Sequence, residues 1–120
     1  MLFQSCHQYD AHGIEGHWQL DSIHHFYNHF HYTEIGDQAR QYQYSENKLR
    51  IIQANNKLEM LYEIQQDTLK WMATHDEKNI SKYQIISLKQ NNMILKEELK
   101  PLFSQSNQSR YQLYYFSRLR

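Results

Sequence analysis

The sequence predicts an all-β protein, an antiparallel up-and-down barrel of about eight strands. From residue 38 onward, short runs of alternating apolar and polar residues are separated by turn residues about every 10–12 positions. The regular part of the chain also opens on Gly16-His17-Trp18 and ends near Arg118. An arginine from the last strand that stacks on an indole of the first strand would join the two chain ends, as a closed barrel requires.

A helical reading is the main alternative, because glycine (three) and proline (one) are scarce. The segment 57–61 also has good helix propensity. Alternation, however, places Leu58, Met60 and Ile64 on one face together with Tyr62, whereas helical spacing from Leu58 leaves Met60 and Ile64 off the apolar stripe. The pattern therefore favours strands.

The alternation predicts a set of inward-facing residues that forms the core and could also line a cup. An eight-stranded barrel is just wide enough to be filled by side chains or to hold one small ligand. A buried phenol needs a hydrogen-bond partner, which a ligand could provide. The predicted inward set is Tyr42, Tyr44, Leu49, Ile51, Leu58, Met60, Tyr62, Ile64, Leu69, Trp71, Ile86, Leu88, Met93 and Leu95. The candidate ligand-binding residues are Tyr42, Tyr44, Met60, Tyr62 and Trp71, together with Phe26 and Phe30.

Residues 22–37 are the exception, because they have no clean period of either kind. We expect a short helix that begins at Ser22, or a long loop, after the first strand. Either structure would lie across the open mouth of the barrel, with residues 23–32 as a lid.

Eight histidines are the main oddity of the composition, and several of them fall in this segment. In a helix, His25 and His29 would share a face at a spacing that suits zinc, and in a strand His29 and His31 would do so. His24 or His17 could supply a third ligand, and one imidazole could instead be an axial ligand of haem. A solvated loop in which histidine is only a polar residue is the other interpretation.

Length and charge exclude several classes of protein. The 120 residues make one domain, and 13 basic residues balance 13 acidic ones without a basic stripe, so no nucleic-acid partner is expected. No segment approaches the ~20 apolar residues that span a bilayer. The chain has no Gly-x-Ser-x-Gly, phosphate-binding glycine loop or His-Glu-x-x-His motif. We therefore expect no catalytic residue, no enzyme activity and no obligatory cofactor.

The N-terminal segment carries the single cysteine, Cys6, which excludes an intrachain disulfide. Residues 2–6 resemble the end of a bacterial lipoprotein signal, in which the cysteine is lipidated. Only five residues precede it, whereas a signal has a basic region and 7–15 apolar residues, so a truncated start and an incidental cysteine both stay open. We expect a tail over residues 1–13, a barrel over 14–120, and membrane contact only through such an anchor.

From about residue 14 to 118, the chain resembles the lipocalin-like domains of bacterial, Bacteroidetes-type, cell-envelope lipoproteins. The residues behind this resemblance are Gly16-x-Trp18, the Leu-x-Ile and Leu-x-Trp hairpins, and the ending Tyr115-Phe116-Ser117-Arg118. The resemblance implies an eight-stranded barrel with a cup for a small apolar ligand, in the periplasm or at the outer membrane. The histidine-rich segment departs from the family pattern.

The expected function is non-enzymatic binding of a small hydrophobic or amphipathic molecule in the barrel cup. A protein-interaction module, such as an immunity or envelope-assembly factor, is one alternative, with a protein as partner. Metal or haem binding through the cluster from His24 to His31 is the other.

Overall fold

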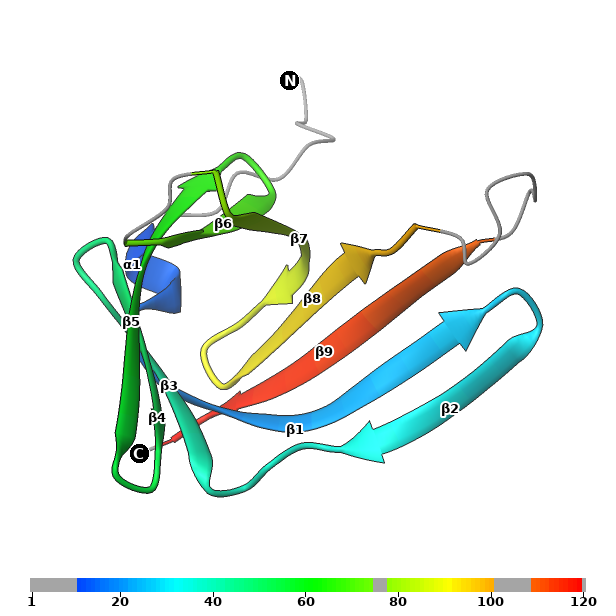
Figure 1. Cartoon of the computed structure of the whole chain (residues 1–120), viewed down its shortest axis with the longest axis horizontal. Coiled ribbons are helices and arrows are strands. Elements are labelled where there is room, and N and C mark those ends of the chain that lie inside the picture. Colours follow the sequence, from blue (N-terminus) through cyan, green and yellow to red (C-terminus); the bar gives the residue numbers. More distant parts are fainter. Residues whose placement is uncertain (1–10, 75–77, 101–108, 120) are drawn as a thin grey trace, which may run out of the picture.

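The computed structural model describes residues 11–74, 78–100 and 109–119, which form a closed antiparallel β-barrel (Figure 1). A single helical turn, α1 (Ala11–Ile14), precedes the strands. The strands of the described residues are β1 (Gly16–Tyr27), β2 (Phe30–Ile35), β3 (Arg40–Ser45), β4 (Lys48–Gln53), β5 (Asn56–Gln65), β6 (Thr68–Ala73), β7 (Ile80–Leu88), β8 (Asn92–Glu98) and β9 (Arg110–Arg118).

The predicted all-β barrel of eight strands is confirmed. Strands β3 to β9 pair with one another in sequence order, and β3 also pairs with β1. The pairing of β1 with β9 closes the cylinder. The additional strand, β2, pairs with β1 alone. It lies along the same edge of β1 as β3, so β2 and β3 are two segments of one interrupted partner strand.

The expected short helix or loop after the first strand is wrong. Residues 22–27 continue β1, and a two-residue turn at Asn28, whose φ is 55°, leads directly into β2. This half of β1 has ladder partners on both sides, β2 and β9, so its backbone groups are satisfied without a helix. We call β2 with residues 22–27 of β1 and 110–115 of β9 the flange. It extends away from the barrel body (Figure 1).

The barrel interior is filled mainly by aromatic and aliphatic side chains. Tyr44 meets Tyr62 edge to face with ring centroids 5.0 Å apart, and Tyr42 meets Phe116 in the same way at 5.2 Å. The buried core consists of Ile14, Trp18, Leu20, Tyr42, Tyr44, Leu49, Tyr62, Leu69, Tyr83, Ile85, Met93, Leu95 and Phe116.

Trp18 and Arg118 seal one end of the barrel. The Arg118 guanidinium lies 4.2 Å from the Trp18 ring centroid, and Trp18 Nε1 donates a hydrogen bond to the Ile14 carbonyl at 2.8 Å. The same guanidinium donates to the carbonyls of Gly13 and Glu15, at 2.8 and 2.5 Å. Gly16, with φ of 126°, leaves the space that the guanidinium occupies. The two ends of the barrel sheet are thereby locked together, as the sequence predicts.

Two predicted core positions, Leu58 and Ile86, are exposed, and a β-bulge explains the second. Ile86 is 44% exposed, and its neighbour Ile85 is buried instead. The register between β7 and β8 shifts between Ile85 and Ser87. An extra residue at this point turns the following side chains to the other face, which strict alternation does not anticipate.

Candidate functional site

The face of the flange that continues the barrel interior carries a row of polar and aromatic residues across four strands. Tyr32 of β2 faces His25 of β1, which faces Gln112 of β9, which in turn faces Glu97 of β8. The next row toward the hairpin tip begins with Phe30, Tyr27 and Arg110. Strand alternation places both rows on the same face.

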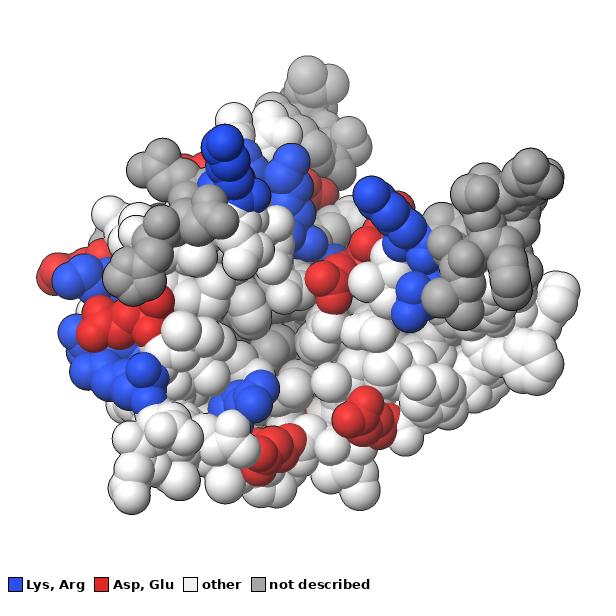
Figure 2. Space-filling model, viewed as in Figure 1, with Lys and Arg blue, Asp and Glu red and all other residues white. Residues whose placement is uncertain are grey.

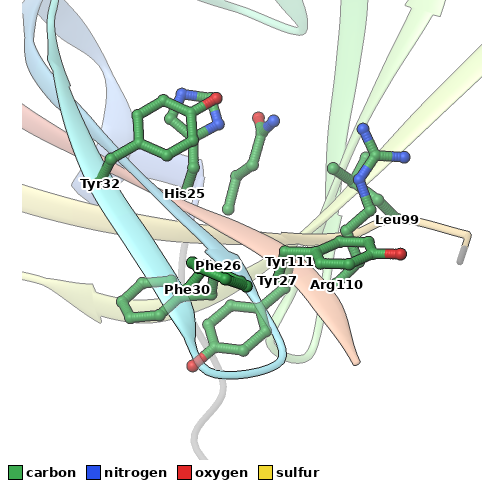
Figure 3. Close-up of a pocket in the computed structure, with 9 residues that line it drawn as sticks. His25, Phe26, Tyr27, Phe30, Tyr32, Leu99, Arg110 and Tyr111 are labelled. Atoms are coloured by element: carbon green, nitrogen blue, oxygen red, sulfur yellow. The ribbon is translucent and has the colours of Figure 1, made fainter. Parts of the chain in front are cut away.

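These rows line a pocket of about 280 Å³ at the flared end of the barrel (Figure 3). Aromatic rings supply most of its wall, and a few polar side chains point into it, the combination expected of a small-molecule site. The lining residues are His25, Phe26, Tyr27, Phe30, Tyr32, Leu99, Arg110, Tyr111 and Gln112.

His25 is fixed in the pocket by two residues of β2. Its ring stacks on Tyr32, with centroids 4.4 Å apart and planes 9° apart. Its Nε2 lies 2.9 Å from Oε1 of Glu34, so the carboxylate orients the imidazole. The β1–β2 register makes this arrangement possible because it puts Tyr32 opposite His25 and places Glu34 beside them on the same face.

Arg110 supplies a positive charge on the side of the pocket away from Tyr32 (Figure 3). Its guanidinium donates one hydrogen bond, to the carbonyl of Lys100 at 3.3 Å. Within the part of the chain that the structure describes, no carboxylate pairs with it. Arg110 can therefore offer further donors to an anionic group in the pocket.

A partly buried phenol, that of Tyr114, marks the boundary between the pocket and the barrel interior. The Tyr114 hydroxyl lies 2.6 Å from Oε1 of Glu97 and 2.6 Å from Oε1 of Gln112. Burial, and next the bond to Glu97, raise the pKa of Tyr114 far above its usual value. Tyr83 packs edge to face on Tyr114 at 5.7 Å, and burial likewise raises its pKa strongly.

These two tyrosines predict a loss of stability at alkaline pH. An unfolded tyrosine ionises near pH 10, whereas Tyr83 and Tyr114 stay protonated in the fold, so the unfolded state binds fewer protons above that pH. The free energy of unfolding should fall on the order of 1 kcal/mol for each tyrosine by about pH 10.5. Urea unfolding at about pH 8 and 10.5 measures this, and the alkaline loss should be smaller in Tyr114→Phe. An equal loss in that variant would contradict the assignment.

The candidate ligand-binding residues fall into three places. Tyr42, Tyr44, Tyr62 and Trp71 lie together in the barrel interior, where the Tyr42 and Trp71 rings are 6.1 Å apart. Phe26 and Phe30 border the flange pocket. Met60 lines a wider depression of about 680 Å³ beside the ends of β5 and β6, together with Leu58, which is 57% exposed. The structure thus separates residues that the sequence grouped into one cup.

Some interior polar atoms make no hydrogen bond of good geometry, namely the hydroxyls of Tyr44 and Tyr62 and Nε1 of Trp71. The nearest polar groups are Trp71 for the Tyr44 hydroxyl and the backbone of Asn47 for the Tyr62 hydroxyl. Burying a hydroxyl without a good hydrogen bond costs free energy. Tyr44→Phe removes this cost and is therefore expected to raise the free energy of unfolding by about 1 kcal/mol. Tyr114→Phe, which removes a hydroxyl that bonds to Glu97, is expected to lower it by about 1–2 kcal/mol. Urea unfolding of the two variants makes the comparison. A clear loss in Tyr44→Phe would mean that its hydroxyl is paired in solution.

The candidate metal ligands do not converge. Because the segment is a strand hairpin, the helical pairing of His25 with His29 does not occur, and His25 and His31 project from opposite faces. His29 is in the turn. Across residues 11–74, 78–100 and 109–119, no three His, Cys, Asp or Glu side chains group as metal ligands would. The predicted lipidation site, Cys6, lies outside the described residues.

Sequence reasoning missed Tyr32, Glu34, Arg110 and Gln112. A hairpin turn at Asn28-His29 would have revealed the first two, because Phe30, Tyr32 and Glu34 then alternate along one strand face. Nothing local points to Arg110 or Gln112, because only the long-range β1–β9 register brings them beside the hairpin.

No family model and no curated protein matches the sequence. The resemblance to lipocalin-like envelope domains therefore stays a prediction beyond the level of the barrel fold. Among the residues described, no helix has the length and apolar character needed to cross a bilayer.

Proposed function

We propose that this protein is a non-enzymatic binding protein whose flange pocket holds a small amphipathic molecule with an apolar or aromatic body and an acidic group. The observation that carries the proposal is the composition of the pocket wall. Aromatic rings stand on β1 and β2, and Arg110 stands on β9 without a carboxylate partner among the described residues. Such a pocket favours a ligand that is apolar at one end and anionic at the other.

The proposed ligand would use the two sides of the pocket differently. Its apolar body would lie against Tyr32 and Phe30, which are 64% and 78% exposed and so have ring surface available for stacking. Its acid would accept hydrogen bonds from Arg110 and Gln112, which are both on β9 and face the pocket. Charge-assisted bonds of this kind are about twice as strong as neutral ones.

The test uses 1-anilinonaphthalene-8-sulfonate, a fluorescent aromatic anion, titrated into the untagged protein. Arg110→Ala should weaken its binding about 10-fold or more, because a hydrogen bond to a charged group contributes about 1.5–3 kcal/mol. Lys82→Ala is the control, since it removes one positive charge from an exposed position on β7. Equal affinity in both variants, or no binding to the wild type, would refute the proposal.

Native mass spectrometry of the untagged protein would then identify the class of the natural ligand. A bound acid of low mass, lost in Arg110→Ala and retained in Lys82→Ala, is the expected result. A bound metal or haem would instead support the histidine cluster. The resemblance supports a location at a bacterial envelope with lipid on Cys6, and mass spectrometry of the protein from membranes would test that modification.

A protein-interaction module is the second candidate, and β2 favours it. Phe30, Tyr32 and Ile35 are 78%, 64% and 79% exposed, all on one six-residue strand. Figure 2 shows no Lys, Arg, Asp or Glu at the tip of the β1–β2 hairpin. Phe30 and Tyr32 lie on the inner face of this strand and Ile35 on the outer face. Exposed apolar side chains on an edge strand are typical of contact surfaces.

A further inference from the structure

Strand β2 has a neighbour on one side only. It pairs with β1, and no other strand of the described chain borders it. All six of its side chains are exposed. In Figure 1 the chain turns from the line of β2 into β3 and the barrel wall, which leaves the outer edge of β2 open along its length.

The hydrogen-bond pattern shows which backbone groups face this open edge. The N–H of Gly36 donates to the carbonyl of Asp21 at 2.9 Å, so these two residues form a hydrogen-bonded pair in the β1–β2 ladder. Hydrogen-bonded pairs alternate along antiparallel strands, which turns the backbone groups of Tyr32 and Glu34 toward β1. The N–H and C=O groups of His31, Thr33 and Ile35, which come between them, point outward. These are the donors and acceptors that a further strand would use.

The edge carries only one of the features that usually protect such strands from pairing, the inward-facing Glu34. Natural edge strands carry lysine, proline, bulges or inward charges, and β2 (FHYTEI) has no lysine, arginine or proline. Its one acid, Glu34, is paired with His25 at 2.9 Å. The pairing of β1 with β2 also runs without a register shift. The strand is therefore suited to accept another strand.

We propose that β2 pairs with β2 of a second copy of this chain, antiparallel and about a twofold axis at Thr33. An axis perpendicular to the sheet places a residue opposite its own copy. With Thr33 at the axis, the outward groups of Thr33 meet those of Thr33 of the second copy, and His31 meets Ile35 of the second copy. This register uses every outward-pointing residue of β2.

The side chains are also complementary in this register. Tyr32 faces Glu34 of the second copy, so the phenol can donate to the carboxylate, and no like charges stand opposite each other. The two inner faces join in one sheet, which places Glu34 of the second copy beside the Tyr32 wall of the flange pocket. A second copy therefore supplies both the backbone partners of the outward groups of β2 and a partner for the Tyr32 hydroxyl.

The first test is the solution mass of the full chain as a function of concentration, measured by analytical ultracentrifugation. The wild type should approach twice the monomer mass as concentration rises. Thr33→Pro removes an outward N–H and leaves the β1–β2 bonds in place, so this variant should stay monomeric. Thr33→Val keeps the N–H and should dimerise like the wild type. A wild type that is monomeric at every concentration overturns the proposal.

A second test does not depend on how well the proline variant folds. In a Cys6→Ser background, Thr33→Cys places two cysteines at the axis, where a hydrogen-bonded pair has Cα atoms about 5.5 Å apart, within disulfide range. Mild oxidation should convert it rapidly into a covalent dimer. Gln41→Cys, exposed on β3, which has neighbours on both sides, is the matched control. Equal crosslinking rates for the two variants would also overturn the proposal.

Discussion

Replacing Trp18 with alanine is expected to lower the free energy of unfolding by about 3–5 kcal/mol, the usual cost of deleting a buried tryptophan side chain. Trp18 is fully buried and lies beneath the Arg118 guanidinium at 4.2 Å. Its indole N–H also holds the carbonyl of Ile14, whose side chain is buried in the same core. The substitution therefore leaves a cavity and removes the surface on which the last strand is fastened to the first. Guanidinium unfolding followed by circular dichroism measures the loss.

Trp18→Phe separates packing from the polar link. Phenylalanine keeps an aromatic ring for Arg118 but has no N–H for Ile14, so its loss should be about half that of Trp18→Ala. Trp71→Ala is a further comparison, because Trp71 is only partly buried and should cost less. A Trp18→Ala protein that loses less than about 1 kcal/mol would mean that the Trp18–Arg118 stack does not hold the barrel closed.

The contact between Trp18 and Arg118 that closes the barrel was predictable because each residue stands in a recognisable local sequence. A glycine two residues before a tryptophan, and an arginine at the end of an aromatic run, are visible without any alignment. Alternation in the barrel strands was equally clear, because one face of each is buried and the other is solvated. Tyr42, Tyr44 and Tyr62 are all buried, as the alternation predicts.

The flange was not predictable in the same way, because its segment lacks a single buried face. On one face Phe26 stacks on Tyr111 at 4.6 Å and packs near His31, and on the other His25 stacks on Tyr32. Aromatic and imidazole rings on both faces erase the two-residue period on which strand prediction depends. Glycine is also scarce, and the turn between β1 and β2 has none to mark it.

The turns explain that scarcity, because they place non-glycine residues in the left-handed region. Glu46 and Asn47 have φ of 46° and 69°, and Ala54 and Gln66 have φ of 54° and 58°. Asparagine tolerates this conformation, and Ser45, Asn55 and Asp67 beside the other three residues still indicate turns there. Predicting the pocket would also require the register of β1 with β9, because only that register brings His25 opposite Gln112. The register joins residues far apart in the sequence, so no local pattern reveals it.

Gly36 stands where the pairing of β1 passes from β2 to β3. It is buried, its N–H bonds to the carbonyl of Asp21 at 2.9 Å, and the opposite edge of β1 has a register shift between Leu20 and Ser22. A Cβ at Gly36 would lie 2.7 Å from the carbonyl carbon of Leu20 and closer still to its oxygen. These are backbone atoms of a strand that is paired on both sides, so they cannot move away without disturbing its backbone pairing.

Gly36→Ala is therefore expected to lower the free energy of unfolding by about 3 kcal/mol. Gly13→Ala is the control, because a Cβ there would lie 3.3 Å from the Cδ2 atom of Leu88, the end of a flexible side chain, and should change the stability by less than about 0.5 kcal/mol. Urea unfolding measures both variants. Amide hydrogen exchange should also become faster in β2 of the Gly36→Ala protein, since the strain falls where β2 is anchored to β1. Similar stabilities for the two variants would show that the β2–β3 junction tolerates a side chain, and the flange would then not depend on this close approach.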